Sequence, residues 1–125
     1  MFKGLIIKES LKDLNTKPYE QYIVHKYRHL MDSQFDIEIH ELNVPDNDVL
    51  EVAYDVSKRL LPMRFYAHFL KNPEMLVAYP NVVVRIDCED KESIKVAQKV
   101  GHLFGIKKRL MKYDEMFERD HPNDL

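Results

Sequence analysis

The sequence is poor in cysteine, glycine and long apolar runs, and each shortage excludes a class of protein. Cys88 is the single cysteine, so the chain can form neither an intrachain disulfide nor a cysteine-rich zinc site. The three glycines lack the spacing of a phosphate-binding loop. No apolar run approaches the roughly 18 residues of a membrane span, and the N-terminal apolar run is too short for a signal peptide. A lone thiol suits a reducing compartment, so we expect a cytoplasmic protein without a membrane partner.

An excess of charge of one sign is also lacking. The chain has 19 basic and 21 acidic residues, which gives a formal net charge of −2. That balance provides no global field to attract nucleic acid or an anionic membrane, so neither is expected as a partner. With 45% hydrophobic and 32% charged residues over 125 positions, the composition is typical of one globular domain spanning 1–125.

The N-terminal part of the chain alternates strand and helix patterns. Consecutive apolar residues predict a strand over Phe2–Lys8, and the turn-forming residues of Leu11–Pro18 predict a loop. A stripe at helical spacing predicts a helix over 19–30; its members are Tyr19, Tyr22, Ile23, Tyr27 and Leu30. Phe35–Val44 alternates apolar and polar residues like a half-exposed strand, and its phase changes after Ile39, which predicts a bulge or a twist.

The pattern continues with a second helix and a three-stranded meander. The helix follows a capping aspartate and ends at Pro62, and its buried stripe is predicted to be Val49, Val52, Ala53, Val56 and Leu60. Strands are then predicted at Arg64–Leu70, Met75–Tyr79 and Val82–Ile86. The connections between them are short, which predicts antiparallel neighbours.

The last part of the chain predicts one regular helix and an ambiguous tail. Asp87–Asp90 supplies caps for a helix that ends at Gly105, a glycine expected in the left-handed conformation with Ile106 as its apolar contact. In the tail, 107–125, a further helical stripe is formed by Leu110, Tyr113 and Phe117. Two alternatives remain for that stripe: it docks on the domain, or it is used for self-association.

The expected order of elements is therefore β-α-β-α-β-β-β-α, with a further C-terminal helix in the tail. A mainly antiparallel sheet with helices on one face is the α+β arrangement. A ferredoxin-like sheet with an extra hairpin, or a related sandwich, is the preferred topology, although sequential order alone does not fix the order of strands.

Three patches of the chain resemble a family of small uncharacterised bacterial and archaeal proteins. The patches are Lys3–Asp13, with its Glu-Ser-Leu run, the Tyr-Ala-His-Phe strand around His68, and Ala97–Ile106. The resemblance implies the same intracellular α+β fold, and the family brings no known activity. The chain departs from it at the Asn81-Val82-Val83 turn and in the basic tail.

Polar residues on the predicted sheet form one candidate ligand site. By alternation, Glu38 and His40 share a face of one strand, and Tyr66 and His68 share a face of another. Arg85 points away from its apolar neighbours and could join them. A site with two imidazoles, a carboxylate, a phenol and a guanidinium could bind a small polar or anionic ligand, or exchange protons near neutral pH. The alternative is an ordinary half-exposed face, or a face covered by helices.

A second candidate is a metal site on the first predicted helix. His25 and His29 are four residues apart and Asp32 follows three later, which would place all three on one side of a helix. The glutamate of the His-Glu-x-x-His hydrolase motif is absent, because Lys26 stands in its place. A solvated face on which two histidines align by chance is the favoured interpretation, so no metal is expected.

No motif identifies a reaction, and none implies a cofactor. The preferred hypothesis is a non-catalytic module that binds a protein partner or a second copy of itself. The alternative is a small enzyme or a metal- or ligand-binding protein that uses His40 with His68, or His25 with His29.

Overall fold

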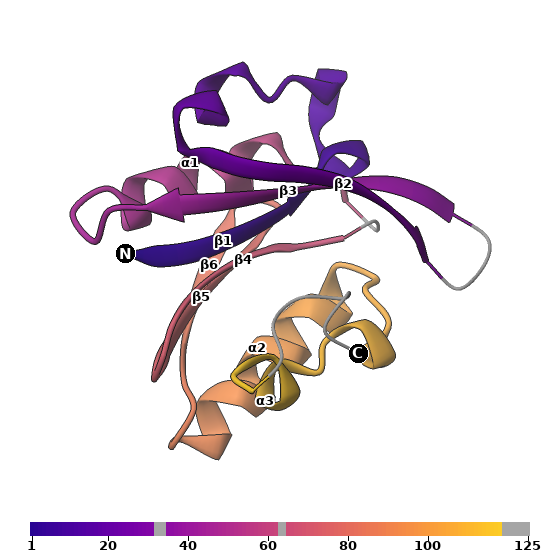
Figure 1. The fold of residues 1–125 in the computed structure, drawn as a ribbon. Helices are drawn as coiled ribbons and strands as arrows, with labels where there is room; N and C mark the ends of the chain where they lie inside the picture. Colours follow the sequence, from indigo (N-terminus) through magenta and orange to yellow (C-terminus); the bar gives the residue numbers. More distant parts are fainter. Residues whose placement is uncertain (32–34, 63–64, 119–125) are drawn as a thin grey trace.

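The computed structural model describes residues 1–31, 35–62 and 65–118 of the chain (Figure 1). The strands in these residues are β1 (Phe2–Ile7), β2 (Ile23–Met31), β3 (Phe35–Val44), β4 (Ala67–Lys71), β5 (Glu74–Tyr79) and β6 (Val82–Asp87). The helices are α1 (Val49–Arg59), α2 (Lys91–Leu103) and the short α3 (Tyr113–Met116). Short 3₁₀ segments lie at Lys8–Ser10, Lys12–Leu14, Lys17–Tyr22 and Lys108–Leu110.

The strands form one antiparallel sheet in the order β2-β3-β1-β4-β5-β6. The predicted meander is confirmed, because β4, β5 and β6 are joined by the short turns at 72–73 and 80–81. Its first strand begins at Ala67, later than predicted, and Arg64 lies outside the described residues. The α+β class is confirmed as well. The ferredoxin-like topology is not confirmed, and the strand order differs from that expectation, with β1 between β3 and β4.

The helix predicted over 19–30 is wrong. Lys17–Tyr22 forms a 3₁₀ segment, and the chain continues as edge strand β2 beside β3. Ile23, Val24 and Tyr27 are β-branched or aromatic residues, which favour strands. The open side of the long strand β3 also offers backbone groups that a helix would leave unpaired. The residues of the apolar stripe therefore belong to a 3₁₀ segment and an edge strand. Pairing with β3 outweighed the local helical pattern.

The phase change in β3 has a different cause from the predicted bulge. The pairing of β3 with β1 runs without a shift from Ile7–Ile39 to Phe2–Val44. Apolar residues instead occupy both faces of the strand, with Ile37 and Ile39 on one face and Leu42 and Val44 on the other. The irregularity lies in β2, between Ile23 and His25. The bulge predicted in β3 is therefore absent from this pairing.

Helices lie on both faces of the sheet, which corrects the expectation of one face (Figure 1). Helix α1 packs on side chains that include Ile6, Leu76 and Ala78, and we call this the α1 face. Helix α2 packs with Val77, Tyr79 and Ile86 on the opposite side, the α2 face. Since Val77 and Ala78 are consecutive in β5, they must point to opposite faces. The sheet is thus the middle layer between α1 and α2.

The two regular helices follow the sequence closely. The five residues of the predicted α1 stripe are all buried, but the helix ends at Arg59, and the last of them, Leu60, is an extended residue just beyond it. The Asp90 side chain caps α2 by accepting hydrogen bonds from the backbone N–H groups of Glu92 and Ser93. Gly105 has a φ of 78°, and the N–H of Ile106 donates to the carbonyl of Gly101, as predicted for this helix end.

The described part of the tail docks on the α2 face. Tyr113 and Met111 are buried, and Leu110 and Phe117 are partly buried against the same cluster. Residues 119–125 of the predicted tail lie outside the described residues. None of the helices in the described ranges combines the length and apolar character that crossing a bilayer would require.

Candidate functional site

The five residues predicted to share one site lie on both faces of the sheet. His40 is paired across the sheet with Ile6, on the α1 face, whereas His68 is paired with Val77, on the α2 face. Directly opposite residues of antiparallel strands share a face, so the two imidazoles are separated by the sheet itself. The prediction that they face a common ligand is therefore wrong.

Arg85 lies away from both histidines. It is opposite Leu76, which places it on the α1 face, but three strands separate β6 from β3. At a strand spacing of about 4.8 Å, that separation is roughly 19 Å. The Arg85 side chain is 74% exposed and forms an ion pair with Glu74 of the neighbouring strand. Arg85 therefore joins neither histidine in a site.

Glu38 and His40 form a local pair on the α1 face. The distance between Glu38 Oε2 and His40 Nε2 is 2.5 Å, and Lys8 Nζ lies 3.9 Å from the same carboxylate oxygen. The hydrogen bond with His40 lowers the pKa of Glu38, and the charges of His40, Lys8 and Lys26 act in the same direction. The His40 side chain is only 2% exposed. The pair thus orders a covered part of the sheet and leaves little room for a substrate.

Tyr66 and His68 belong to an aromatic cluster on the α2 face. Their ring centroids are 6.1 Å apart, and the Tyr66 ring packs edge-on against Tyr113 at 5.2 Å. The Tyr66 hydroxyl donates a hydrogen bond to the carbonyl of Leu110. Tyr79 donates to the Ala97 carbonyl at 2.7 Å, and its hydroxyl lies 2.5 Å from that of Tyr113. These contacts fasten the tail to the sheet, so the cluster has a structural role.

Burial governs the ionisation of these phenols. It raises the pKa of Tyr79 and of Tyr113 well above the usual value of a tyrosine. Both hydroxyls therefore stay protonated throughout the physiological range, as hydrogen-bonding groups and not as bases.

The predicted metal pair does not have the geometry of a metal site. His25 and His29 lie on strand β2, where four residues span roughly 13 Å. Asp32, the third expected ligand, lies outside the described residues. Within residues 1–31, 35–62 and 65–118, no group of three or more His, Cys, Asp or Glu side chains could hold a metal ion.

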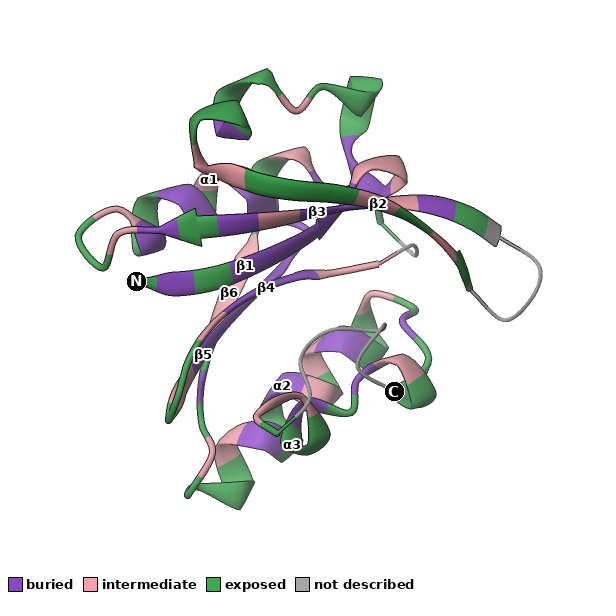
Figure 2. Cartoon of the chain, in the orientation of Figure 1, coloured by how far each residue is buried: buried purple, intermediate pink, exposed green. Residues whose placement is uncertain are grey.

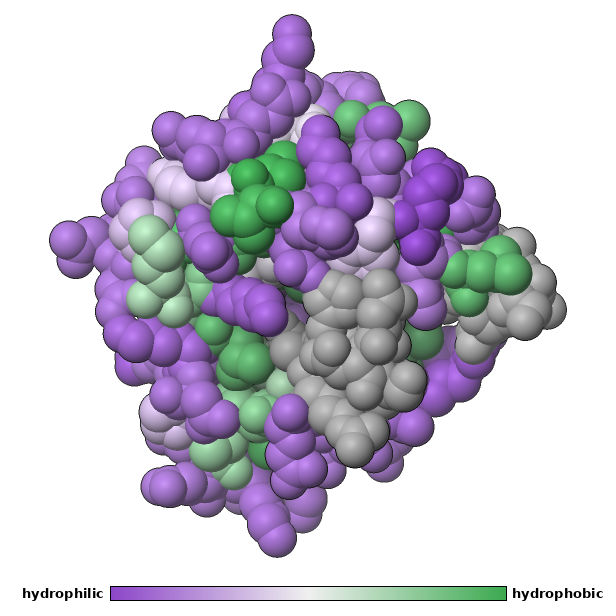
Figure 3. Space-filling model, viewed as in Figure 1, coloured by the Kyte–Doolittle hydropathy of each residue, from purple (hydrophilic) through white to green (hydrophobic). Residues whose placement is uncertain are grey.

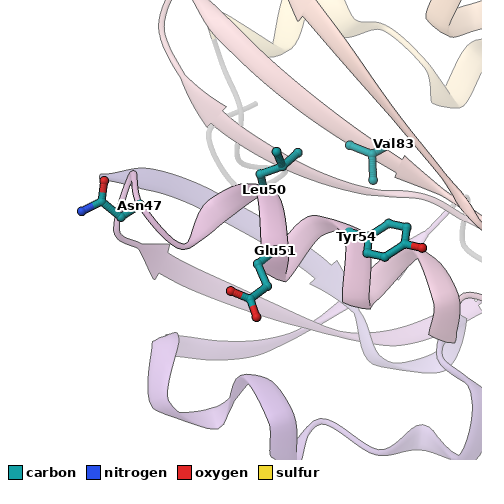
Figure 4. Close-up of a pocket in the computed structure, with 5 residues that line it drawn as sticks. All are labelled: Asn47, Leu50, Glu51, Tyr54 and Val83. Atoms are coloured by element: carbon teal, nitrogen blue, oxygen red, sulfur yellow. The ribbon is translucent and has the colours of Figure 1, made fainter.

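The structure instead presents a groove between helix α1 and edge strand β6, which the sequence analysis did not identify. The groove has a volume of about 510 Å³ and is lined by Asn47, Leu50, Glu51, Tyr54 and Val83. Figure 4 shows Leu50 and Tyr54 projecting from the helix on the side of Val83, with Glu51 turned away. Leu50 is 64% exposed and Tyr54 52%. Two large apolar side chains thus border an open strand edge.

The backbone of β6 directs hydrogen-bonding groups outward at alternate residues. The N–H of Cys88 donates to the carbonyl of Pro73, in the same register as the whole β5–β6 pairing. Hydrogen-bonded pairs alternate along antiparallel strands, so Val84 also bonds inward to β5. Val83, Arg85 and Asp87 therefore point their N–H and C=O groups away from the sheet. Among the described residues, no strand pairs with this edge.

The two edges of the sheet differ in chemistry. Edge strand β2 exposes Lys26 and Arg28, and charged side chains of this kind discourage pairing with another chain. Figure 2 shows β2 largely exposed beside the largely buried β3. Edge strand β6 instead begins with the three valines Val82–Val84, each partly exposed. The first half of the β6 edge therefore lacks the charges of the β2 edge, and Arg85 and Asp87 follow only after the valines.

Figure 3 shows the described atoms on one face as mostly hydrophilic, with hydrophobic residues in small separate groups. Scattered groups of this size are normal on a protein surface.

A run of three valines after a turn was the signal available in the sequence for this edge. Spacing predicts the strand but not its place at the border of the sheet, and only the border position makes it a binding surface. Comparison of the chain with protein-family models, with curated proteins and with solved structures found no match.

Proposed function

We propose that the chain is a non-catalytic cytoplasmic module that binds a protein through its β6 edge. A bound segment would extend the sheet as an added strand, and its alternate side chains would enter the groove beside Leu50 and Tyr54. The observation that carries this proposal is the apolar, unpaired edge strand next to an exposed apolar groove. Strand addition of this kind takes affinity from backbone hydrogen bonds and specificity from the side-chain pockets.

The histidine-based alternatives have weaker support. His40 and His68 are 2% and 4% exposed and lie on opposite faces of the sheet. Neither ring is open to a substrate from solvent, and a general base must reach the proton that it removes. No observation therefore favours an enzyme over a binding module.

An extended peptide of alternating valine and threonine tests the proposal. It is titrated into the dilute protein, and the protein's NMR spectrum is recorded at each step. We expect chemical-shift changes at the Val83 and Arg85 amides and at Leu50 and Tyr54. The same peptide, N-methylated at every residue, should produce no such change, because it lacks donors for strand pairing on both of its edges. Binding elsewhere on the protein, or no binding, would contradict the proposal.

Matched variants locate the binding to one edge. Val83→Lys places a charge in the groove and should abolish the response. Val24→Lys changes an exposed valine of β2, the other edge, and should leave the response intact.

A further inference from the structure

One of the three outward-facing residues of β6 already has its backbone occupied. Ser93 Oγ accepts a hydrogen bond from the N–H of Asp87 at 3.1 Å and lies 3.2 Å from the carbonyl of the same residue. The cap of α2 thus closes the C-terminal end of the edge. Among the described residues, the outward groups of Val83 and Arg85 have no such partner. The open part of the edge is therefore two outward residues with Val84 between them.

This pattern is self-complementary. We infer that β6 pairs with the β6 strand of a second copy of this chain, antiparallel and centred on Val84. The inference rests on the proposed binding function and names the partner. In this register, Val83 of each copy is opposite the partner's Arg85, so every open N–H and C=O group of the edge is used.

Neighbouring registers fit less well. Centring the pair on Arg85 places two guanidinium groups directly opposite one another, an unfavourable like-charge contact. It also sets Val83 against the partner's Asp87, whose backbone Ser93 already occupies. Centring the pair on Ile86 would require the backbone of Asp87 in both copies. A register centred on Val83 would need Asn81, which has a φ of 64° and donates its N–H to Ser57.

The side chains support the same register on both faces. On the α2 face, Val84 meets the partner's Val84, and Val82 lies opposite the partner's Ile86, whose side chain is already buried within its own copy. On the α1 face, the partner's Arg85 stands opposite Val83, a lining residue of the groove. The ring of Tyr54 also lines the groove. A guanidinium arriving there meets an aromatic face, which is a surface that it favours.

Cross-linking through Val84 tests the register. Opposite residues in a pair without hydrogen bonds have Cα atoms about 4.5 Å apart, within the range that a disulfide spans. In a Cys88→Ser background, Val84→Cys should form a covalent dimer upon mild oxidation. Val82→Cys is the matched control, because its two copies would lie four residues apart, roughly 13 Å, and should not cross-link. Equal cross-linking of both variants, or of neither, would overturn the proposed register.

The mass of the wild-type protein in solution tests whether its partner is a second copy of the chain, without the use of any variant. Size-exclusion chromatography with light scattering over a wide concentration range should show a monomer–dimer equilibrium, and Val83→Lys should shift it to monomer. A monomer at every concentration would overturn the inference. If that monomer still binds the valine–threonine peptide at β6, the binding function stands and only the partner is wrong. If it binds no peptide, both proposals fail.

Discussion

At the scale of single residues, the Glu38 carboxylate links stability to pH. Its pKa is lowered in the folded protein, chiefly by the hydrogen bond with His40. The stability that this provides is fully present above the unfolded pKa, about 4.3, and is lost as the pH falls through the lowered folded value. We expect Glu38→Gln to reduce the free energy of unfolding at pH 7 by about 1 kcal/mol.

Urea unfolding between pH 7 and pH 3 checks this expectation. The wild-type chain should lose more stability over the acid range than Glu38→Gln, so the two curves should converge at low pH. Glu115→Gln, which changes an exposed carboxylate, is the control and should follow the wild type. Parallel curves for Glu38→Gln and the wild type would show that the pair contributes nothing that depends on pH.

The same scale explains why the candidate ligand site was not predictable. Alternation correctly indicated that Glu38 and His40 share one face of a strand, and the structure brings them within hydrogen-bond distance. Alternation within one strand does not show which residues of another strand lie on the same face of the sheet. His40 and His68 both pair with β1, His40 with Ile6 and His68 with Leu5. Because Ile6 and Leu5 are consecutive, the two histidines lie on opposite faces.

At the scale of elements, Gly101 sets how closely the tail approaches α2. A Cβ at this position would lie 2.2 Å from Met111 Sδ and 3.0 Å from a ring carbon of Tyr79. Overpacking costs about 1–3 kcal/mol, whereas alanine gains only about 1 kcal/mol in helix propensity. We therefore expect Gly101→Ala to lower the free energy of unfolding by about 1 kcal/mol and to loosen the tail.

Denaturant unfolding and limited trypsin digestion together measure both effects. The basic residues Lys107, Lys108, Arg109 and Lys112 provide cleavage sites in the segment that would move. Gly101→Ala should be cut there faster than the wild type, and Lys99→Ala, an exposed change in the same helix, should not. Unchanged stability and digestion would mean that Met111 absorbs the added methyl group by changing its rotamer.

Elements also show where sequence patterns succeed and where they fail. Helices α1 and α2 have buried stripes and clear ends, and the meander has short turns, so local signals sufficed for them. Local signals do not suffice for strand β2, because it is stabilised by its pairing with β3, which is a tertiary interaction. Its residues fit a helical stripe about as well as a strand, and only the open side of β3 distinguishes the two.

At the scale of the whole molecule, the two edges of the sheet determine how far association can proceed. Pairing through β6 uses one edge of each copy and joins two six-stranded sheets, leaving a β2 strand at each end. Those ends carry Lys26 and Arg28 on the α1 face, opposite His40 and Glu38 of β3. The charges on β2 would then stop growth at the dimer, because charged side chains on an edge strand oppose further pairing.

Removing these charges should therefore open the second edge. In Lys26→Val/Arg28→Val, both edges of each copy can pair, and the assembly no longer closes, as expected for chains with two association surfaces. Light scattering should detect species larger than the dimer, increasing with protein concentration. Lys26→Arg/Arg28→Lys retains both charges and should keep the wild-type mass. Because the Arg28–Asp36 ion pair is exposed, its loss contributes little to stability. A charge-free variant that keeps the wild-type mass would show that the charges on β2 do not limit assembly.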